Sequence, residues 1–512
     1  MPFRAVLFFA AFLVSRQFGA EVTTSEPELR IRVTDEKGRP IAARLEVRGP
    51  GGTMYRPAGA FHEKMTKARG GELYYLGSFV TDGTASIYVP VGKYLLVAEH
   101  GLEYERVERA VEVPSGGPVK VSIRLRPWVR MREKGWWSGD VHVHHTPEEA
   151  KLLVRAENLN LAVLTTRGAR MDWDSSTRDG VIAVPPHHWI LTRNYEDERR
   201  GGAWILDGLQ RPLDLRNLGA WFLPGISVVR QARAQRPPGG IFPWFDIDMP
   251  IWWEVPVMMA LEPADSLNVI HNQFMQYGID TSEYWGRPYD RREFGGRIGF
   301  VAYSLGLYDR YLNLGFRLAP TAGTGSGVMP SPTGYNRVYA QVKEPFTVEK
   351  WFSAIRDGRS FVTNGPVLFF KATREGGRVK TRVEALAREP IDRIEIVANG
   401  RVLKRFAPTT GSKTFKGVFS FNERGFSWAL ARCFLKPGVT IRLAQSSPVY
   451  LHGKWDARSD AEYFVAWMDD LINLHIMGVT KITEPAQREE LLTLYRRARA
   501  VYASKARRET PE

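Results

Sequence analysis

Between residues 28 and 126, apolar and polar side chains alternate over short stretches separated by turn-forming residues. The alternation predicts strands at residues 29–33, 43–47 and 85–89, because successive side chains of a strand point to opposite faces. Residues 35–38, Asp-Glu-Lys-Gly, form a turn signal between the first two strands. Short strands at this spacing without helical segments predict a β-sandwich, and nothing in it indicates chemistry.

From residue 127 to residue 366 the pattern changes to alternating strands and helices. Residues 136–143 alternate with a period of two, residues 147–157 have a helical pattern, and residues 159–165 are an apolar run. Thr146, followed by Pro147 and with Glu149 three residues after it, is a capping box that marks the start of the helix. These segments predict a strand–helix–strand unit.

Further segments of the same region extend this pattern. Strands are predicted at residues 204–206, 240–245, 264–270 and 298–303, and a helix at residues 347–357. About 240 residues of this kind suit one α/β barrel of the TIM type, distorted by long loops. The carboxyl ends of the strands of such a barrel carry its chemistry.

The last part of the chain returns to strands and ends in helices. Strands are predicted at residues 367–372, 391–397, 415–421 and 440–443, which indicates a smaller β-sandwich over residues 367–452. Helices follow over residues 458–506. Asp460 can cap one that runs to His475, and Thr483 can cap one that begins at Pro485. The last helix has an apolar stripe that we expect to pack on the body: Leu491, Leu492, Tyr495, Ala498 and Tyr502.

Composition narrows the class of protein. The chain has 512 residues, with 71 Lys and Arg against 56 Asp and Glu, and a formal net charge of +15. A basic balance favours anionic partners, although general surface character is the alternative explanation of the excess. We expect a small-molecule or anionic substrate. The charges are mixed throughout and no basic-aromatic module indicates nucleic-acid recognition. The pattern does not indicate an oligomeric state.

The N-terminus has the layout of a secretory signal. Arg4 supplies a positive charge, residues 5–14 are apolar, and the stretch ends at Gly19-Ala20. We therefore expect residues 1–20 to be a signal peptide and the mature chain to be exported, periplasmic or extracellular. No later segment reaches membrane-spanning length. The single cysteine, Cys433, leaves no partner for an intramolecular disulfide.

The candidate chemistry begins in the strand at residues 136–143. Asp140, His142 and His144 alternate with Val141 and Val143, so the polar residues share a face with Cα atoms about 7 Å apart. Two imidazoles at this spacing can lean onto one metal ion. The alternative is a half-buried strand whose histidines meet backbone groups or water.

A metal ion needs further oxygen or nitrogen donors. Glu196 or Glu198 can supply a third ligand from a neighbouring strand end, although a charged turn is the alternative for this stretch. Asp246 and Asp248 lie one strand period apart in apolar surroundings, so they need a cation, either a metal ion or an arginine.

Three other residues are candidates for the same site. His271 follows an apolar run, where a barrel strand delivers a site residue, although a hydrogen-bonded structural histidine is the alternative. His145 can act as acid, base or outer partner of the site. Arg167, at the end of the second strand, can clamp an anionic group, or neutralise Asp246 or Asp248 in an inactive site.

Several motifs resemble one known family. The stretch Gly139-Asp140-Val141-His142-Val143-His144 resembles the first motif of the polymerase-and-histidinol-phosphatase-like (PHP) domain, in particular its exported CehA/McbA family of metallohydrolases. Residues 252–256, 334–339, 358–366 and 446–450 agree with that family. Residues 82–94 resemble the carboxypeptidase-regulatory-like or Ig-like modules that precede exported enzymes. The PHP resemblance implies a seven-stranded barrel with up to three divalent ions, usually zinc, manganese or iron, and hydrolysis of phosphoesters or related bonds.

The remaining motifs of that family are reduced in this chain. The second motif aligns with Thr165-Thr166-Arg167 and the last with residues 323–327, and neither retains the usual ligands. The third aligns with Glu196 or Glu198. Two hypotheses follow: an exported metal-dependent hydrolase with one ion, zinc or manganese first, and a catalytically inactive relative that serves as a binding or scaffold protein.

Overall fold

The computed structural model describes residues 26–62, 77–167, 179–199, 201–215, 225–283, 286–478 and 484–507. The expected signal peptide and the expected cap Thr483 lie outside these residues. The chain divides into two compact units, which are described separately. The described part of the first unit comprises residues 26–62, Gly77–Glu99 and Arg106–Arg126, and the second contains His100–Glu105 and all described residues from Pro127 onward.

The first unit consists of two small sheets. One has the order β5 (Thr84–Tyr88), β1 (Glu28–Thr34), β8 (Val119–Arg124). The other contains β2 (Ala43–Arg48), β3 (Met54–Tyr55), β4 (Phe79–Thr81), β6 (Gly92–Glu99) and β7 (Val107–Val113), with a short 3-10 helix at Pro50–Gly52. In β1, Leu29, Ile31 and Val33 are buried in alternation, as the sequence predicted. After β1, Asp35 accepts hydrogen bonds from the backbone N–H of Lys37 and Arg39, which forms the predicted turn.

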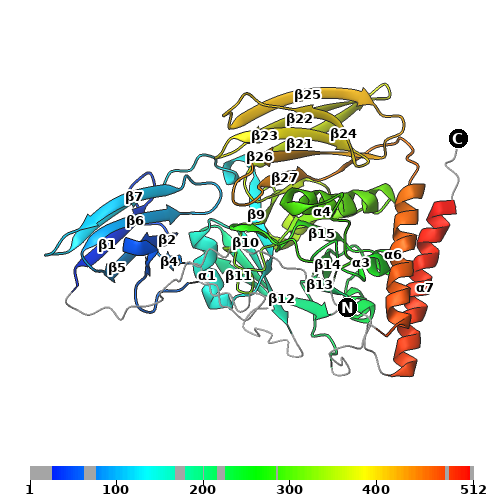
Figure 1. Ribbon diagram of the computed structural model, residues 1–512, viewed down its shortest axis with the longest axis horizontal. Coiled ribbons are helices and arrows are strands. Elements are labelled where there is room, and N and C mark those ends of the chain that lie inside the picture. The colour runs from blue at the N-terminus through cyan, green and yellow to red at the C-terminus, as the bar shows by residue number, and fades with distance from the viewer. Residues whose placement is uncertain are drawn as a thin grey trace, which may run out of the picture. The chain divides into compact units, whose positions relative to one another are not determined.

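One large mixed sheet dominates the second unit (Figure 1). Its first part contains β9 (Trp136–Val143), β10 (Leu161–Arg167), β11 (Val181–Val184), β12 (His188–Arg199), β13 (Gly202–Asp207), β14 (Trp244–Ile247), β15 (Ser266–Ile270) and β18 (Ala319–Ala322). β9, β10 and β12 pair in parallel, as do β14, β15 and β18, whereas β13 is antiparallel to both of its neighbours. A two-stranded hairpin, β16 (Phe274–Met275) and β17 (Gly278–Ile279), follows β15.

The two ends of this run of strands meet. The segment after β18 returns to β9, where the N–H of Gly325 donates to the carbonyl of His142 at 2.8 Å and the N–H of His144 donates to the carbonyl of Ser326 at 2.7 Å. A parallel bridge joins Val143 to Ser326. The strand run β9–β10–β12–β13–β14–β15–β18 therefore turns back on itself beside the two histidines.

The strand–helix–strand unit at the start of this run is confirmed. β9 and β10 are parallel and are joined by α1 (Pro147–Ala156), after a short 3-10 helix at Arg132–Lys134 before β9. Thr146 accepts a hydrogen bond from the N–H of Glu149, and the Glu149 carboxylate accepts one from the N–H of Thr146. This reciprocal pair satisfies backbone donors that the first turn leaves without helical partners.

The predicted strand at residues 298–303 is wrong, because this stretch belongs to α4 (Gly296–Asn313). A strand would bury Ile298, Phe300 and Ala302 together, but Ile298 is 62% exposed and Ala302 is exposed as well. Many of the buried side chains instead recur at a spacing of three and four, among them Phe300, Val301, Ser304, Leu305, Tyr308, Tyr311 and Leu312. A window of six residues rich in β-branched and aromatic side chains hid the longer helical period.

The remaining strands continue the same sheet beyond β9. They are β19 (Arg337–Gln341), β20 (Ser360–Thr363), β27 (Leu443–Ser446), β26 (Trp428–Leu435), β23 (Ile391–Ala398) and β24 (Arg401–Phe406), with β28 (Val449–Tyr450) at the side of β26. A separate three-stranded sheet contains β21 (Val367–Glu375), β22 (Arg378–Leu386) and β25 (Thr414–Asn422). Strands from the predicted regions 127–366 and 367–452 thus share one continuous sheet, through the pairing of β20 with β27. Two strands begin later than predicted: β14 begins at Trp244 instead of residue 240, and β27 begins at Leu443 instead of residue 440.

The other helices are α2 (Gly225–Arg233), α3 (Val255–Leu261), α5 (Val348–Arg356), α6 (Arg458–Ile476) and α7 (Pro485–Arg507). α5 lies within the predicted helix at residues 347–357, and Thr347 caps it by accepting from the N–H of Lys350. Asp460 was predicted as the cap of α6 but lies inside its first turn, where its carboxylate binds Arg310 and Asn313.

The two C-terminal helices lie side by side (Figure 1). α7 also packs on α3. All five residues of the predicted apolar stripe of α7 are buried. The Tyr502 hydroxyl donates to the carbonyl of Pro256 at 2.8 Å, which ties the end of α7 to α3. Among the described residues, no helix combines the length and the apolar character needed to cross a bilayer.

The helical assignment of α4 can be tested at its glycines. Gly306 lies inside α4, and a Cβ added there would meet no atom within 4 Å. Gly306→Ala should therefore raise the free energy of unfolding by about 1 kcal/mol, because alanine loses less backbone entropy in a helix. Gly315, just after α4, has φ +84°. Gly315→Ala should lower the unfolding free energy, and chemical denaturation of both variants measures the two signs. Destabilisation by Gly306→Ala would contradict the assignment.

Candidate metal centre

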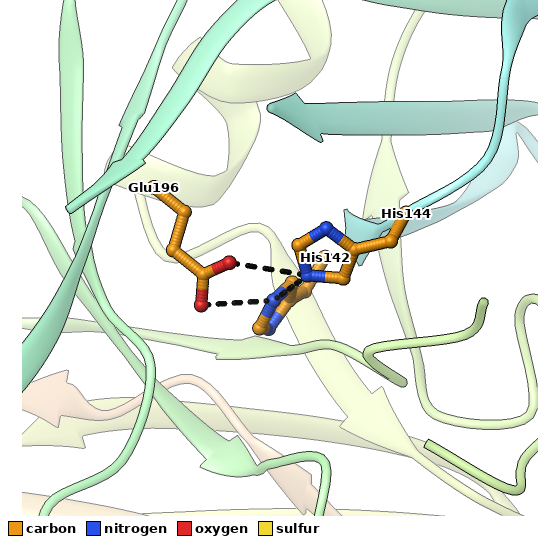
Figure 2. A group of neighbouring side chains, drawn as sticks. All are labelled: His142, His144 and Glu196. Atoms are coloured by element: carbon orange, nitrogen blue, oxygen red, sulfur yellow. Dashed lines mark hydrogen bonds and ion pairs between the residues drawn. The ribbon is translucent and has the colours of Figure 1, made fainter. Parts of the chain in front are cut away.

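His142, near the end of β9, and His144, directly after it, project toward one point (Figure 2). The Nε2 atoms of the two rings lie 2.8 Å apart, and the ring planes are 70° apart. His142 is fully buried and His144 is partly buried. The period-two alternation of the strand brings both rings to the same side, as the sequence predicted.

Glu196 completes this group from β12. β12 pairs with β10, which pairs with β9, so the residue stands two strands away from the histidines. One carboxylate oxygen lies 3.4 Å from His142 Nε2 and the other lies 3.1 Å from His144 Nε2 (Figure 2). Of the two glutamates predicted as alternatives, the structure brings Glu196 to the histidines, whereas Glu198 is exposed near the end of β12.

The outer nitrogen of each ring has its own acceptor. His142 Nδ1 lies 2.9 Å from an oxygen of Asp248, and His144 Nδ1 lies 3.1 Å from the carbonyl oxygen of Thr165. A carbonyl oxygen can only accept, so His144 Nδ1 carries a proton and its Nε2 presents a lone pair. Asp248 favours the same tautomer of His142. Partners of this kind orient metal-binding histidines.

The distances among the three inner groups fit a bound ion. Bonds of about 2.0–2.2 Å to nitrogen and oxygen place neighbouring ligand atoms about 3 Å apart. The observed separations of 2.8, 3.1 and 3.4 Å agree with that spacing. His142, His144 and Glu196 can therefore hold a metal ion. They are the one group of three or more such side chains that converges within the described part of the chain.

The surroundings of this group are strongly negative. Although burial alone lowers the pKa of His142, the charges of Glu196 and Asp248 raise it well above its ordinary value. Burial raises the pKa of Asp246 to about 7, against hydrogen bonds from Ser266 and Thr321 that lower it. The potential at the two rings thus favours a cation.

Asp248 and Asp246 lie beside the group and not in it. Asp248 bonds the outer nitrogen of His142, which is a supporting position. Asp246 is fully buried, and its carboxylate accepts hydrogen bonds from the Ser266 hydroxyl at 2.7 Å, the Thr321 hydroxyl at 2.9 Å and the Asn268 amide at 3.1 Å. Neutral donors therefore satisfy Asp246.

His271 and His145 also lie outside the converging group. His271 is fully buried after β15, with its Nε2 3.1 Å from the hydroxyl of Ser304, and burial lowers its pKa to about 3. It is a neutral, hydrogen-bonded histidine. His145 Nδ1 lies 3.2 Å from Glu149 in the capping box of α1. The backbone of Arg167 pairs with Glu196 in the sheet, and its side chain lies outside the described residues.

Two functional features were not predicted. The carbonyl of Thr165, which fixes His144, has no signature in a sequence because every residue has a carbonyl. Asp207 ends the apolar strand β13 and is fully buried, and burial followed by the charge of Asp246 raises its pKa well above the ordinary value. A carboxylate that ends an otherwise apolar run was a usable signal for Asp207.

Metal binding tests the group directly. After incubation with zinc or manganese and removal of loosely held ions, we expect about one ion per chain by elemental analysis. His142→Ala and His144→Ala should each remove it, because two donors hold a divalent ion weakly. His188→Ala is the matched control, since His188 is also buried but bonds the carbonyl of Leu159 at 2.7 Å. Metal-free wild-type protein, or an ion retained by both variants, would contradict the assignment.

Comparisons with protein-family models and with curated proteins found no match for this chain. The geometry around His142, His144 and Glu196 and the motifs that the chain carries are thus the observations from which a function can be inferred.

Proposed function

We propose that the protein is an exported, metal-dependent hydrolase of the PHP type with a reduced site that holds one ion. The observation that carries the proposal is the convergence of His142, His144 and Glu196, with both outer ring nitrogens already bonded to acceptors. Side chains prepared in this way have lone pairs directed at a common centre. A catalytic ion usually has three protein ligands and keeps a further position for water or substrate.

The fold supports the same family. Seven strands, from β9 to β18, form a run whose ends meet beside the histidines, as expected of a small barrel. His142 lies at the carboxyl end of β9, His144 directly follows this strand, and Glu196 lies in the carboxyl-terminal half of β12. Barrel enzymes build their sites at this end of the strands. The first motif of the PHP resemblance thus coincides with the converging side chains.

Each residue of the site has a separate task. When bound, a divalent ion supplies Lewis acidity, which lowers the pKa of water and polarises the bond to be cleaved. His142 and His144 bind and orient through Nε2, while Asp248 and the Thr165 carbonyl hold the protons on Nδ1. Glu196 adds negative charge that favours a cation over a neutral ligand. His144 is the more exposed of the two histidines, with 8% of its side chain accessible against 0% for His142.

The donor set limits which metal ions fit the site, and the net charge of the chain favours one class of substrate. Two imidazoles and one carboxylate suit zinc, and manganese is the second choice. The formal net charge of +15 favours anionic substrates. We therefore propose a phosphoester, or a related ester or amide, of a small molecule as substrate.

Hydrolysis of chromogenic esters tests the activity. Zinc- or manganese-loaded protein should cleave p-nitrophenyl phosphate, bis(p-nitrophenyl) phosphate or p-nitrophenyl acetate above the rate of buffer containing the same ion. His142→Ala and His144→Ala should return to that background, whereas His188→Ala should retain activity. Protein that binds one ion without turnover of any of these esters would favour the inactive binding or scaffold alternative.

Asp248 offers a more selective test. Asp248→Asn keeps the shape of the side chain but removes the charge that faces His142 Nδ1. Loss of an outer partner of this kind lowers metal affinity about 10–100-fold. Asp309→Asn is the matched control, because Asp309 is also a buried aspartate but pairs with Arg432 at 2.6 Å. Competition with a chelator measures both affinities, and equal values for the two variants would contradict the role of Asp248.

A further inference from the structure

The segment Gly323-Thr324-Gly325-Ser326-Gly327, here called the glycine loop, lies directly against both histidines. Gly325 donates its N–H to the carbonyl of His142, and the carbonyl of Ser326 accepts from the N–H of His144. The loop is therefore bonded to the backbone on either side of Val143. Any movement of the loop moves the two residues that carry the converging rings.

Two glycines of the loop make the contact possible. A Cβ added at Gly323 would lie 2.5 Å from the Cβ of His142, and one added at Gly327 would lie 2.1 Å from the carbonyl oxygen of His144. Gly327 also has φ +90°, which other residues rarely adopt. The loop thus touches both histidines at distances that only glycine permits.

The loop does not bind an anion through its N–H groups as a phosphate-binding loop does. The N–H of Thr324 donates to Asp140, that of Gly325 donates to His142, and that of Ser326 donates to the hydroxyl of Thr324. These three donors are already used within the protein. These backbone N–H groups therefore bind residues of β9 and of the loop itself, and not a ligand.

Asp140 fastens the loop to the strand. Its fully buried carboxylate accepts from the N–H of His142 at 3.1 Å, the N–H of Thr324 at 3.1 Å and the N–H of Gly334 at 2.8 Å. It also accepts from the hydroxyl of Thr324. One carboxylate therefore connects β9, the glycine loop and the turn before β19.

These four donors require a carboxylate. A carboxylate only accepts, so both of its oxygens can serve N–H and O–H donors at once. In Asp140→Asn the amide NH2 would face either the N–H of Gly334 or the N–H groups of His142 and Thr324. Two facing donors repel, and a buried donor without an acceptor costs about 1–3 kcal/mol.

We infer that Asp140 and the glycine loop form a positioning device that sets the separation of the His142 and His144 rings. This inference rests on the proposed metal site, but it concerns the metal-free geometry of the chain as well. Asp140 touches no ligand atom and acts through the backbone of His142 and through the loop. It is thus a positioning residue.

Two readouts on Asp140→Asn test the inference. Metal affinity, measured by competition with a chelator using zinc alone, should fall about tenfold or more, as for other outer supports of metal ligands. In a crystal structure of the metal-free variant, the two Nε2 atoms should no longer lie at their wild-type separation. Thr324→Val, which removes only the hydroxyl that binds Asp140, should change both readouts in the same direction and serves if Asp140→Asn does not fold.

Asp309→Asn controls for a general loss of stability, because it should lower the melting temperature while metal affinity and ring separation stay as in the wild type. Wild-type ring separation in metal-free Asp140→Asn, or in Thr324→Val if only that variant folds, would overturn the inference whether or not the protein binds metal. Altered ring geometry in the variant, together with absence of turnover by the metal-loaded wild-type protein, would leave the positioning role intact and remove the hydrolase proposal alone.

Discussion

The site depends on the hydrogen bonds that fix the outer nitrogens of two imidazole rings. Asp248 holds His142 Nδ1 and the Thr165 carbonyl holds His144 Nδ1, so the two Nε2 atoms face each other at 2.8 Å. Two lone pairs and a carboxylate at such distances repel each other unless a cation lies among them. The energy needed to hold them together comes from the sheet, which places β9, β10 and β12 side by side in parallel.

The interior of the strand run is adapted to this charge. β13 and β14 are antiparallel with Ile205 opposite Asp246, so alternation places Asp207, Asp246 and Asp248 on one face. Barrel interiors are ordinarily filled by branched apolar side chains. An interior with three aspartates on neighbouring strands is costly for folding, and it is retained by hydrogen bonds to Asp246 and by the pairing of Asp248 with His142. The charges of Asp248 and Glu196 beside the rings increase their attraction for a cation.

The sequence predicts local features of this arrangement well and long-range features poorly. β9 and the cap of α1 follow from residues within ten positions of each other, and both are confirmed. The choice between Glu196 and Glu198 depends on the register of β12 against β10, which the sequence of β12 alone does not specify. The role of Asp248 depends on a contact with His142 over 106 positions of the chain. The helix α4 was missed because its residues 298–303 also fit a strand.

A proton and a metal ion are the two cations that fit between the rings. A proton on His142 Nε2 makes one strong and linear hydrogen bond, either to His144 Nε2 or to Glu196. A metal ion instead binds all three groups at once. The observed separations of 2.8, 3.1 and 3.4 Å between the ligand atoms are close to those around one ion. The same carboxylates that raise the pKa of His142 therefore set up a competition between the two cations. Since a bound ion must displace the proton, ion affinity rises as pH increases.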